Sequence, residues 1–179
     1  MLDPVSTPTT TLLIRYGAIP EVARFTNPQS ISVARGDAVI VSTHRGPELG
    51  SVLESLRPAA EPGTGEPAEP SGEVLRRASD SDRDRATELR RDAAQEFTGW
   101  EQRIAEWQLD LQLVDLEWTI DRSRLILYVL NERGPDCAKL ALQAAAGGWG
   151  VIDVQPVAAE GLLPKETGHG GCGSCGCHN

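Results

Sequence analysis

The densest chemistry in the sequence lies near its C-terminal end, where three thiols and two imidazoles fall within ten residues: Cys172, Cys175, Cys177, His169 and His178. Thiolates combined with imidazole are suitable ligands for zinc or for an iron-sulfur cluster, and the intervening glycines let a short backbone wrap around an ion. A closed zinc site usually draws two ligands from each of two separated segments, whereas Cys172 to His178 is a single short stretch. We therefore predict a partial metal site that a second copy, a partner or a labile ion completes.

A second interpretation of this segment is a flexible, glycine-rich tail, residues 157–179, whose thiols stay reduced in the cytoplasm. A cytoplasmic address is expected because the first residues lack the basic start and apolar stretch of a signal peptide. No apolar run approaches the roughly 18 residues of a membrane span, so no membrane partner is expected. Cys137 lies apart from the tail, in the first turn of an expected helix, and is predicted to be a small buried side chain.

Catalytic arrangements find little support in the sequence. His44 is the one histidine outside the tail, and its position at an apparent strand end beside Arg45 predicts a surface residue. Asp115, Glu117 and Asp121 alternate with apolar residues, which predicts a solvated strand face in preference to an acid-base pair or a hard-metal site. No phosphate-binding loop, dinucleotide fingerprint or zincin helix occurs, so we expect no enzymatic activity.

Direct RNA binding is the weakest of three functional hypotheses. The net charge of −9 opposes the neutralisation of phosphates on which non-specific nucleic-acid affinity depends. Residues 147–150 formally satisfy the G-x-x-G clamp of KH modules. That clamp joins two helices, whereas here it precedes an expected strand.

The elements that must carry these residues divide into two lobes. Within residues 1–56, short β-branched runs bounded by turn residues predict a small, antiparallel, barrel-like lobe, with strands at residues 11–16, 21–25, 38–43 and 49–53. The tripeptide Arg35-Gly36-Asp37 is predicted to be the turn before one of these strands. Residues 57–79 begin with a stretch rich in Pro, Gly and Glu and are predicted to be a linker.

Residues 80–156 predict an α-β-β-α-β sandwich lobe with both helices on one face of the sheet, which makes the chain α+β. After Asp80, the expected N-cap, apolar residues recur every three or four positions over about 25 residues. This stripe is expected to pack on the lobe's own sheet. Alternatively, its tryptophans Trp100 and Trp107 contact a partner protein. Strands at residues 114–120, 125–130 and 151–155 and a second helix ending at Ala146 complete the lobe.

Two stretches, residues 36–52 and 113–130, go beyond generic pattern. The matching positions are Gly36, Asp37, Val39, Arg45, Gly46, Gly50 and Val52 in the first stretch, and Val114, Asp115, Glu117 and Asp121 in the second. In these motifs the chain resembles the PSP-type C-terminal domain family, named for a yeast polymerase suppressor, and in particular its bacterial, YaaT-like branch. The resemblance implies a non-catalytic cytoplasmic protein of multi-protein assemblies that influence RNA processing and developmental signalling.

The leading functional hypothesis is therefore an adaptor or regulatory subunit whose partners are other proteins of a complex. The alternative, from a different class, is a metal-handling protein that binds zinc or an iron-sulfur cluster through its tail. A shared tail metal would also allow the chain to form a homo-oligomer.

Overall fold

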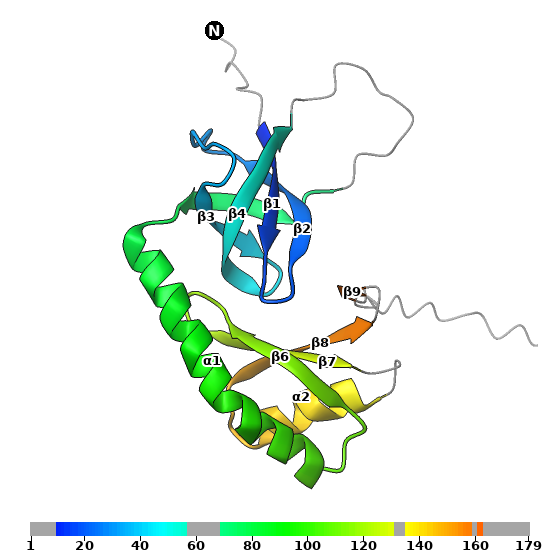
Figure 1. The fold of residues 1–179 in the computed structure, drawn as a ribbon. Helices are drawn as coiled ribbons and strands as arrows, with labels where there is room; N and C mark the ends of the chain where they lie inside the picture. Colours follow the sequence, from blue (N-terminus) through cyan, green and yellow to red (C-terminus); the bar gives the residue numbers. More distant parts are fainter. Residues whose placement is uncertain (1–9, 57–68, 131–134, 159–160, 163–179) are drawn as a thin grey trace, which may run out of the picture.

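The computed structural model describes residues 10–56, 69–130, 135–158 and 161–162. These residues form a mixed α+β fold, in which a closed five-stranded barrel is followed by a four-stranded sheet with two helices (Figure 1). The fold class expected from the sequence is thus confirmed.

The barrel is built from five strands: β1 (Thr10–Tyr16), β2 (Glu21–Asn27), β3 (Ala38–Thr43), β4 (Gly46–Leu56) and β5 (Gly72–Arg77). Their order around the barrel is β1-β2-β5-β3-β4. Apolar residues at alternate positions of these strands point inward and fill the barrel, as the period of a strand requires. The buried set is Leu12, Ile14, Tyr16, Phe25, Val39, Val41, Val52 and Val74.

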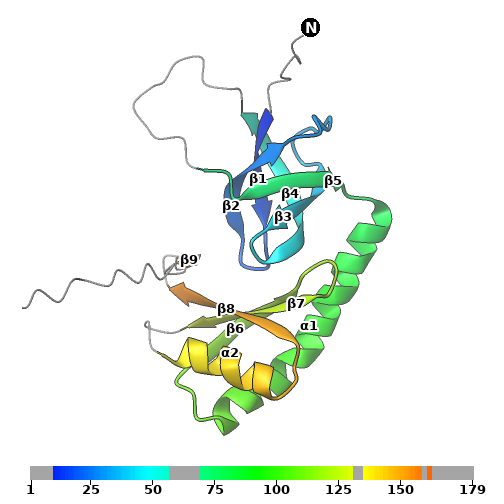
Figure 2. The ribbon, with the colours of Figure 1, turned by 180° about the vertical axis from the view of Figure 1, so that it is seen from behind.

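Strand β5 corrects the predicted linker, because Gly72–Arg77 closes the barrel instead of connecting the lobes (Figure 2). It pairs antiparallel with β3 and parallel with β2, so the barrel is not purely antiparallel. A Cβ at Gly72 would overlap the carbonyl oxygen of Ser42, so only glycine lets the two backbones approach this closely. The strand escaped prediction because Val74 is its one fully buried side chain.

The second lobe contains α1 (Asp80–Glu106), β6 (Gln112–Trp118), β7 (Arg124–Leu130), α2 (Asp136–Ala146), β8 (Val151–Ala158) and the short β9 (Gly161–Leu162). The sheet order is β6-β7-β8-β9. Strands β7 and β8 are parallel, and α2 is the crossover between them. The apolar strand predicted to be central is therefore flanked on both sides.

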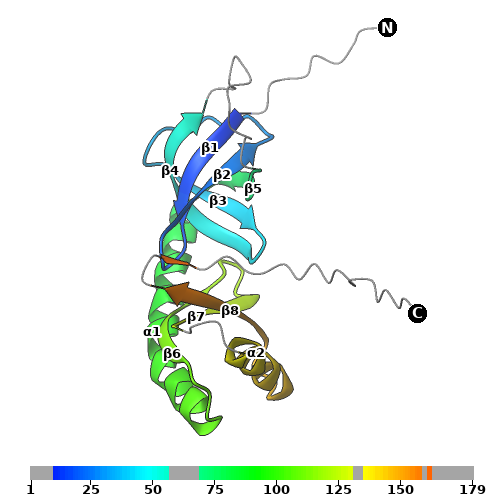
Figure 3. The same ribbon diagram turned by 90° about the vertical axis from the view of Figure 1, so that its right-hand side faces the viewer.

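The sheet is the middle layer of the molecule. Leu125, Leu127 and Val129 of β7 face both helices and form one core with residues such as Trp100 and Leu140. The intervening residues of β7 face the opposite way, toward the turn between β1 and β2. Both helices thus lie on one sheet face, as expected, while the barrel covers the other face (Figures 1 and 3).

The N-cap of helix α1 is Ser79, one residue before the expected Asp80. The Ser79 hydroxyl accepts from the Asp82 amide, and the Asp82 carboxylate accepts from the Ser79 amide, which together form a capping box. Hydrogen bonds from Arg76 and Ser79 lower the pKa of Asp82. Neither helix in the described part of the chain combines the length and apolarity that crossing a bilayer requires.

A bulge in β6 alters the alternation expected for this strand. Its pairing with β7 shifts between Leu113 and Asp115, so Val114 has no directly opposed partner. Leu113 and Leu116 are buried as a result, whereas Val114 is exposed. The sequence pattern had placed Val114 on the buried face, because strict alternation does not allow for an inserted residue.

Candidate interaction site

The two lobes are joined through a buried arginine, Arg45, in the tight turn between β3 and β4. Its guanidinium binds Glu48 with two hydrogen bonds, from Nε to Oε1 at 3.0 Å and from Nη2 to Oε2 at 2.9 Å. Its third nitrogen, Nη1, donates to the hydroxyl of Tyr128 on β7 at 3.1 Å. Only 1% of Arg45 is exposed, so a charged side chain of the barrel is buried against the sheet of the second lobe.

Glu117 of β6 continues this network from the other lobe. The Tyr128 hydroxyl donates to Glu117 Oε2 at 2.9 Å, and the backbone amide of Ala18, in the turn between β1 and β2, donates to the same oxygen at 2.7 Å. The backbone amide of Ile120 also donates to the Pro47 carbonyl at 2.9 Å. The solvated face predicted for β6 is therefore wrong at Glu117, because the barrel covers that face.

The environment of the network is apolar enough to alter its ionisation. Burial raises the pKa of Tyr128 and also raises the pKa of Glu48, although the Arg45 charge acts against the latter shift. Burial acts to lower the pKa of Arg45, but the negative charge of Glu48 and its hydrogen bonds raise that pKa above its ordinary value. No buried side-chain nitrogen or oxygen of the described residues lacks a hydrogen-bond partner. The junction is therefore a saturated polar lock that fixes the orientation of the two lobes.

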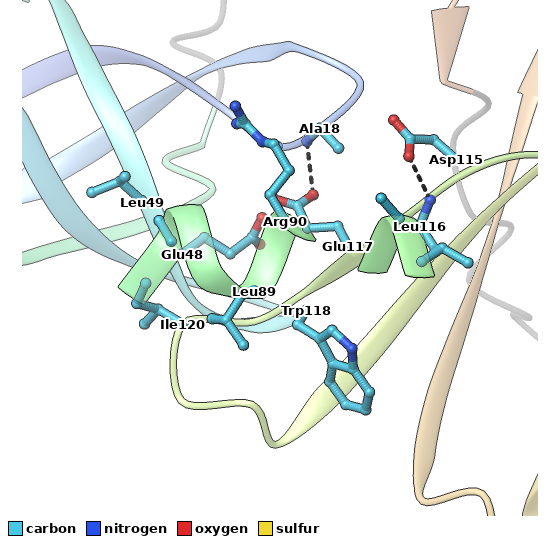
Figure 4. Close-up of a pocket in the computed structure, with 13 residues that line it drawn as sticks. Ala18, Glu48, Leu49, Leu89, Arg90, Asp115, Leu116, Glu117, Trp118 and Ile120 are labelled. Atoms are coloured by element: carbon cyan, nitrogen blue, oxygen red, sulfur yellow. Dashed lines mark hydrogen bonds between the residues drawn. The ribbon is translucent and has the colours of Figure 1, made fainter. Parts of the chain in front are cut away.

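Beside this lock lies an open groove of about 230 Å³. Its walls come from three elements: the first half of α1, the barrel end at Ala18 and Leu49, and the consecutive residues 115–118 of β6 (Figure 4). Ala94 and Arg90 line the groove from α1 and are exposed. The groove can accommodate part of another molecule at the place where both lobes are held together.

The groove runs along the terminal strand of the sheet, and this strand edge is partly protected. Asp115 Oδ1 accepts a hydrogen bond from the Leu116 amide at 2.8 Å, so one backbone donor is already used. A carboxylate on an edge strand also discourages uncontrolled pairing with other strands. We therefore expect an occupant to bind through side-chain contacts with α1 and the barrel.

The structure brings only some of the residues predicted for a site into the described region. Trp100 is 2% exposed and packs in the core between α1 and the sheet, whereas Trp107 is half-buried at the end of α1 and packs against the same core. These are the intramolecular contacts expected for the stripe, and the alternative, a partner contact of Trp107, stays a prediction. His44 is exposed, and Cys137 packs half-buried against the core.

The predicted metal ligands lie outside the described residues: Cys172, Cys175, Cys177, His169 and His178. Elsewhere, within the described ranges, no group of three His, Cys, Asp or Glu residues could hold a metal ion. The tail metal site stays a prediction.

Sequence reasoning missed the polar lock. Arg45 and Gly46 belong to the motif that carried the family resemblance, yet the motif gave no indication that Arg45 is buried. The available signal was Glu48, which follows Arg45 at a spacing of three residues and pairs with it in the structure. Nothing local pointed to Tyr128, which lies 83 residues away.

Comparisons with known proteins agree with the motif evidence. The family model of the PSP1 C-terminal conserved region matches residues 72–141, which include β5, α1, β6, β7 and the first half of α2. The stage 0 sporulation protein YaaT of Bacillus subtilis (strain 168) is 28% identical over 150 residues, which cover 84% of this chain and 52% of that protein. The chain thus spans about half the length of this relative. No solved structure matches.

Proposed function

Since residues 72–141 are a PSP1 C-terminal conserved region and the chain is a distant homologue of the sporulation protein YaaT, we propose that it works as a non-catalytic adaptor. It acts in the cytoplasm as a regulatory subunit of a multi-protein complex. The relative is named for stage 0 of sporulation, which supports a role in developmental regulation. An influence on RNA processing is the further expectation from the family resemblance.

The observation that carries this proposal is the open groove beside the saturated lock. The buried charged groups there are already hydrogen-bonded within the network, which is a structural role. None of these groups is therefore available as an acid, base or nucleophile. The lock also holds the walls of the groove in a fixed arrangement before any partner arrives. A preformed surface loses less conformational entropy on binding, which favours recognition of another protein.

Two variants, in each of which one alanine of α1 is replaced by phenylalanine, test the groove as the partner surface. Ala94 is exposed and lines the groove, whereas Ala105 is exposed on the same helix and does not line it. Phenylalanine at either position projects from the helix surface, but only Ala94→Phe fills the groove. Tagged full-length parent, Ala94→Phe and Ala105→Phe proteins are purified from native cells, and the co-purifying proteins are quantified by mass spectrometry.

We expect the parent and Ala105→Phe to retain the same partner proteins in constant ratio. Ala94→Phe should lose them by about tenfold or more, which corresponds to roughly 1.4 kcal/mol of binding free energy. If both variants retained the partner proteins equally, the groove would not be the partner surface. A parent protein that purifies alone, also after chemical cross-linking in the cells, would refute the adaptor function itself.

The concentration of thiols and imidazoles in the tail favours a second candidate function, the handling of zinc or of an iron-sulfur cluster. Three cysteines with histidines on either side supply a partial ligand set for such a group. Metal content and visible absorption of anaerobically purified protein are compared with those of a variant ending at Gly168 and of Cys137→Ser. Metal in the parent and in Cys137→Ser, but not in the shortened chain, is the expected result. Equal metal content with and without the tail would contradict it.

A further inference from the structure

Three of the four tryptophans of the chain surround one pocket on the helix-bearing side of the second lobe. The pocket has a volume of about 380 Å³, and Trp118 is the one residue that it shares with the lining of the groove between the lobes. Trp100 comes from α1, Trp118 from the end of β6 and Trp149 from the loop between α2 and β8. Trp107 is not among the residues that line it.

The guanidinium of Arg103 packs against two of these indoles. Its central carbon is 3.7 Å from the ring centroid of Trp149 and 4.9 Å from that of Trp100. The two indoles are in edge-to-face contact, with centroids 6.0 Å apart. Stacking against aromatic faces holds the guanidinium plane in one orientation while leaving its N–H donors at the rim of the ring system.

The charge of Arg103 is the one that the pocket leaves unmatched. In the part of the chain that the structure describes, no side chain forms an ion pair or a hydrogen bond with Arg103. The carboxylate in the same pocket, Glu96, is already occupied, because Trp118 Nε1 donates to it at 3.2 Å and Arg122 lies 3.7 Å from it. An incoming group would therefore meet a free cation beside apolar rings.

Two glycines make room for this arrangement. A Cβ at Gly99 would lie 3.2 Å from Arg103 Nη1, and a Cβ at Gly147 would lie 2.7 Å from Trp149 Nε1. Gly99 sits inside a long helix, where glycine is less favourable than alanine, so its presence there has a cost to helix formation. Both glycines have their closest contacts with the residues that form the cation-aromatic stack.

We propose that this pocket binds the C-terminal carboxylate of a partner protein whose last residue is bulky and apolar. Arg103 supplies a planar donor fork, which matches a carboxylate better than any other anion-binding side chain of this size. Trp149, 45% exposed, and the half-buried Trp118 supply the apolar contact for the adjacent side chain, while the buried Trp100 packs against Trp149. The volume lies at the small end of ligand pockets, which suits one terminal residue better than a long segment.

This site differs from the groove of the proposed function, and it can be tested with the purified full-length chain alone. The four indole N–H signals in ¹H–¹⁵N spectra report each tryptophan separately. N-acetyl-phenylalanine is the probe, and its C-terminal amide, which has the same ring but no charge, is the control. We expect the acid to shift the signals of the pocket tryptophans with a dissociation constant on the order of 1 mM, while Trp107 stays unmoved.

The preference for acid over amide should be about tenfold in the parent and should fall as salt is added. Arg103→Gln should remove the preference, whereas Arg91→Gln, an exposed arginine of the same helix outside the pocket, should keep it. Gly147→Ala should weaken binding of both probes by displacing Trp149. Equal binding of acid and amide by the parent, or no shift up to about 20 mM acid, would overturn the proposal.

A peptide pair then separates a protein terminus from a free small acid. A six-residue peptide ending in phenylalanine with a free carboxylate should bind at least as tightly as the probe, and its amidated form should bind more weakly. If the free acid binds but the peptide does not, the partner is not a protein terminus and the proposal is refuted in that form. These outcomes do not depend on whether the groove binds a partner, so the two proposals fail separately.

Discussion

Replacing Arg45 by methionine should reveal how much of the stability of the molecule depends on the junction between its lobes. The substitution leaves Glu48 buried without its cation, since the two residues share both hydrogen bonds of a bidentate pair. Removing one partner of a buried ion pair typically costs about 3 to 5 kcal/mol of unfolding free energy, because an uncompensated charge remains. The Tyr128 hydroxyl also loses its donor.

The double variant Arg45→Met with Glu48→Met distinguishes the unpaired charge from the loss of packing. Two apolar side chains of similar length leave no buried charge, and such replacements are often neutral in stability. We expect the double variant to recover most of the loss and to lie within about 2 kcal/mol of the parent. Arg77→Met is the matched control, because its exposed pair with Asp37 should contribute less than about 1 kcal/mol.

The loss in Arg45→Met should also depend on pH. Burial already raises the pKa of Glu48 above its ordinary value of 4.5, and the Arg45 charge is the largest influence that lowers it again. A carboxyl whose folded pKa is raised contributes stability that is present below its unfolded pKa and is lost as pH rises through the folded pKa. The variant should therefore lose less stability at about pH 5 than at about pH 8.

Urea unfolding measures these effects with two probes. All four tryptophans lie in the second lobe, so their fluorescence reports that lobe, whereas circular dichroism reports both lobes. The parent should give coincident transitions and Arg45→Met separate ones. A loss below about 1 kcal/mol near pH 7, or an equal loss in the Glu48→Met background, would show that the unpaired Glu48 charge is not what destabilises the variant.

Four further substitutions have expected outcomes that thermal or urea unfolding can check. Gly72→Ala should destabilise by about 2 kcal/mol or more, since its Cβ would overlap the neighbouring strand of the barrel, and a loss below about 0.5 kcal/mol would contradict that contact. Ser79→Ala should cost about 1 kcal/mol near pH 7 through loss of the helix cap. The folded state lowers the pKa of Asp82, so the contribution of Asp82 to that cap should fade as pH drops below its ordinary pKa of 3.8. A loss of stability in Asp82→Asn that does not change with pH would contradict this. Tyr128→Phe should cost about 1 to 2 kcal/mol, because Arg45 and Glu117 each lose a hydrogen bond, and an unchanged stability would mean that water replaces the hydroxyl.

The elements that could be predicted are those whose pattern is local. The stripe of α1 repeats over many turns, and the β-branched run of β3 is bounded by turn residues, so β3 was predicted with its observed bounds. Strand β5 was missed because a strand with one buried residue resembles a polar linker. The bulge at Val114 was missed because it depends on pairing with β7, and alternation along one strand carries no information about it.

The junction could not be predicted for the same physical reason. Arg45, Glu117 and Tyr128 are ordinary as single residues, and each could lie in solvent. Their burial follows from the barrel covering one face of the sheet, which is a relation between distant segments. The tryptophan pocket is an intermediate case, since Trp100 was singled out on its helix but Arg103 and Trp149 were not.

Strand β5 also bears on what the matched region 72–141 can do alone. The match begins at the strand that closes the barrel, whose hydrogen-bonded neighbours β2 and β3 lie earlier in the chain. It ends inside α2, before β8, the parallel partner of β7. A protein cut at these positions would leave β5 without either neighbour and β7 without its parallel partner, so we expect it to aggregate and not to fold. The matched region 72–141 is therefore not a unit of folding by itself, because it needs β2, β3 and β8 to complete its two sheets.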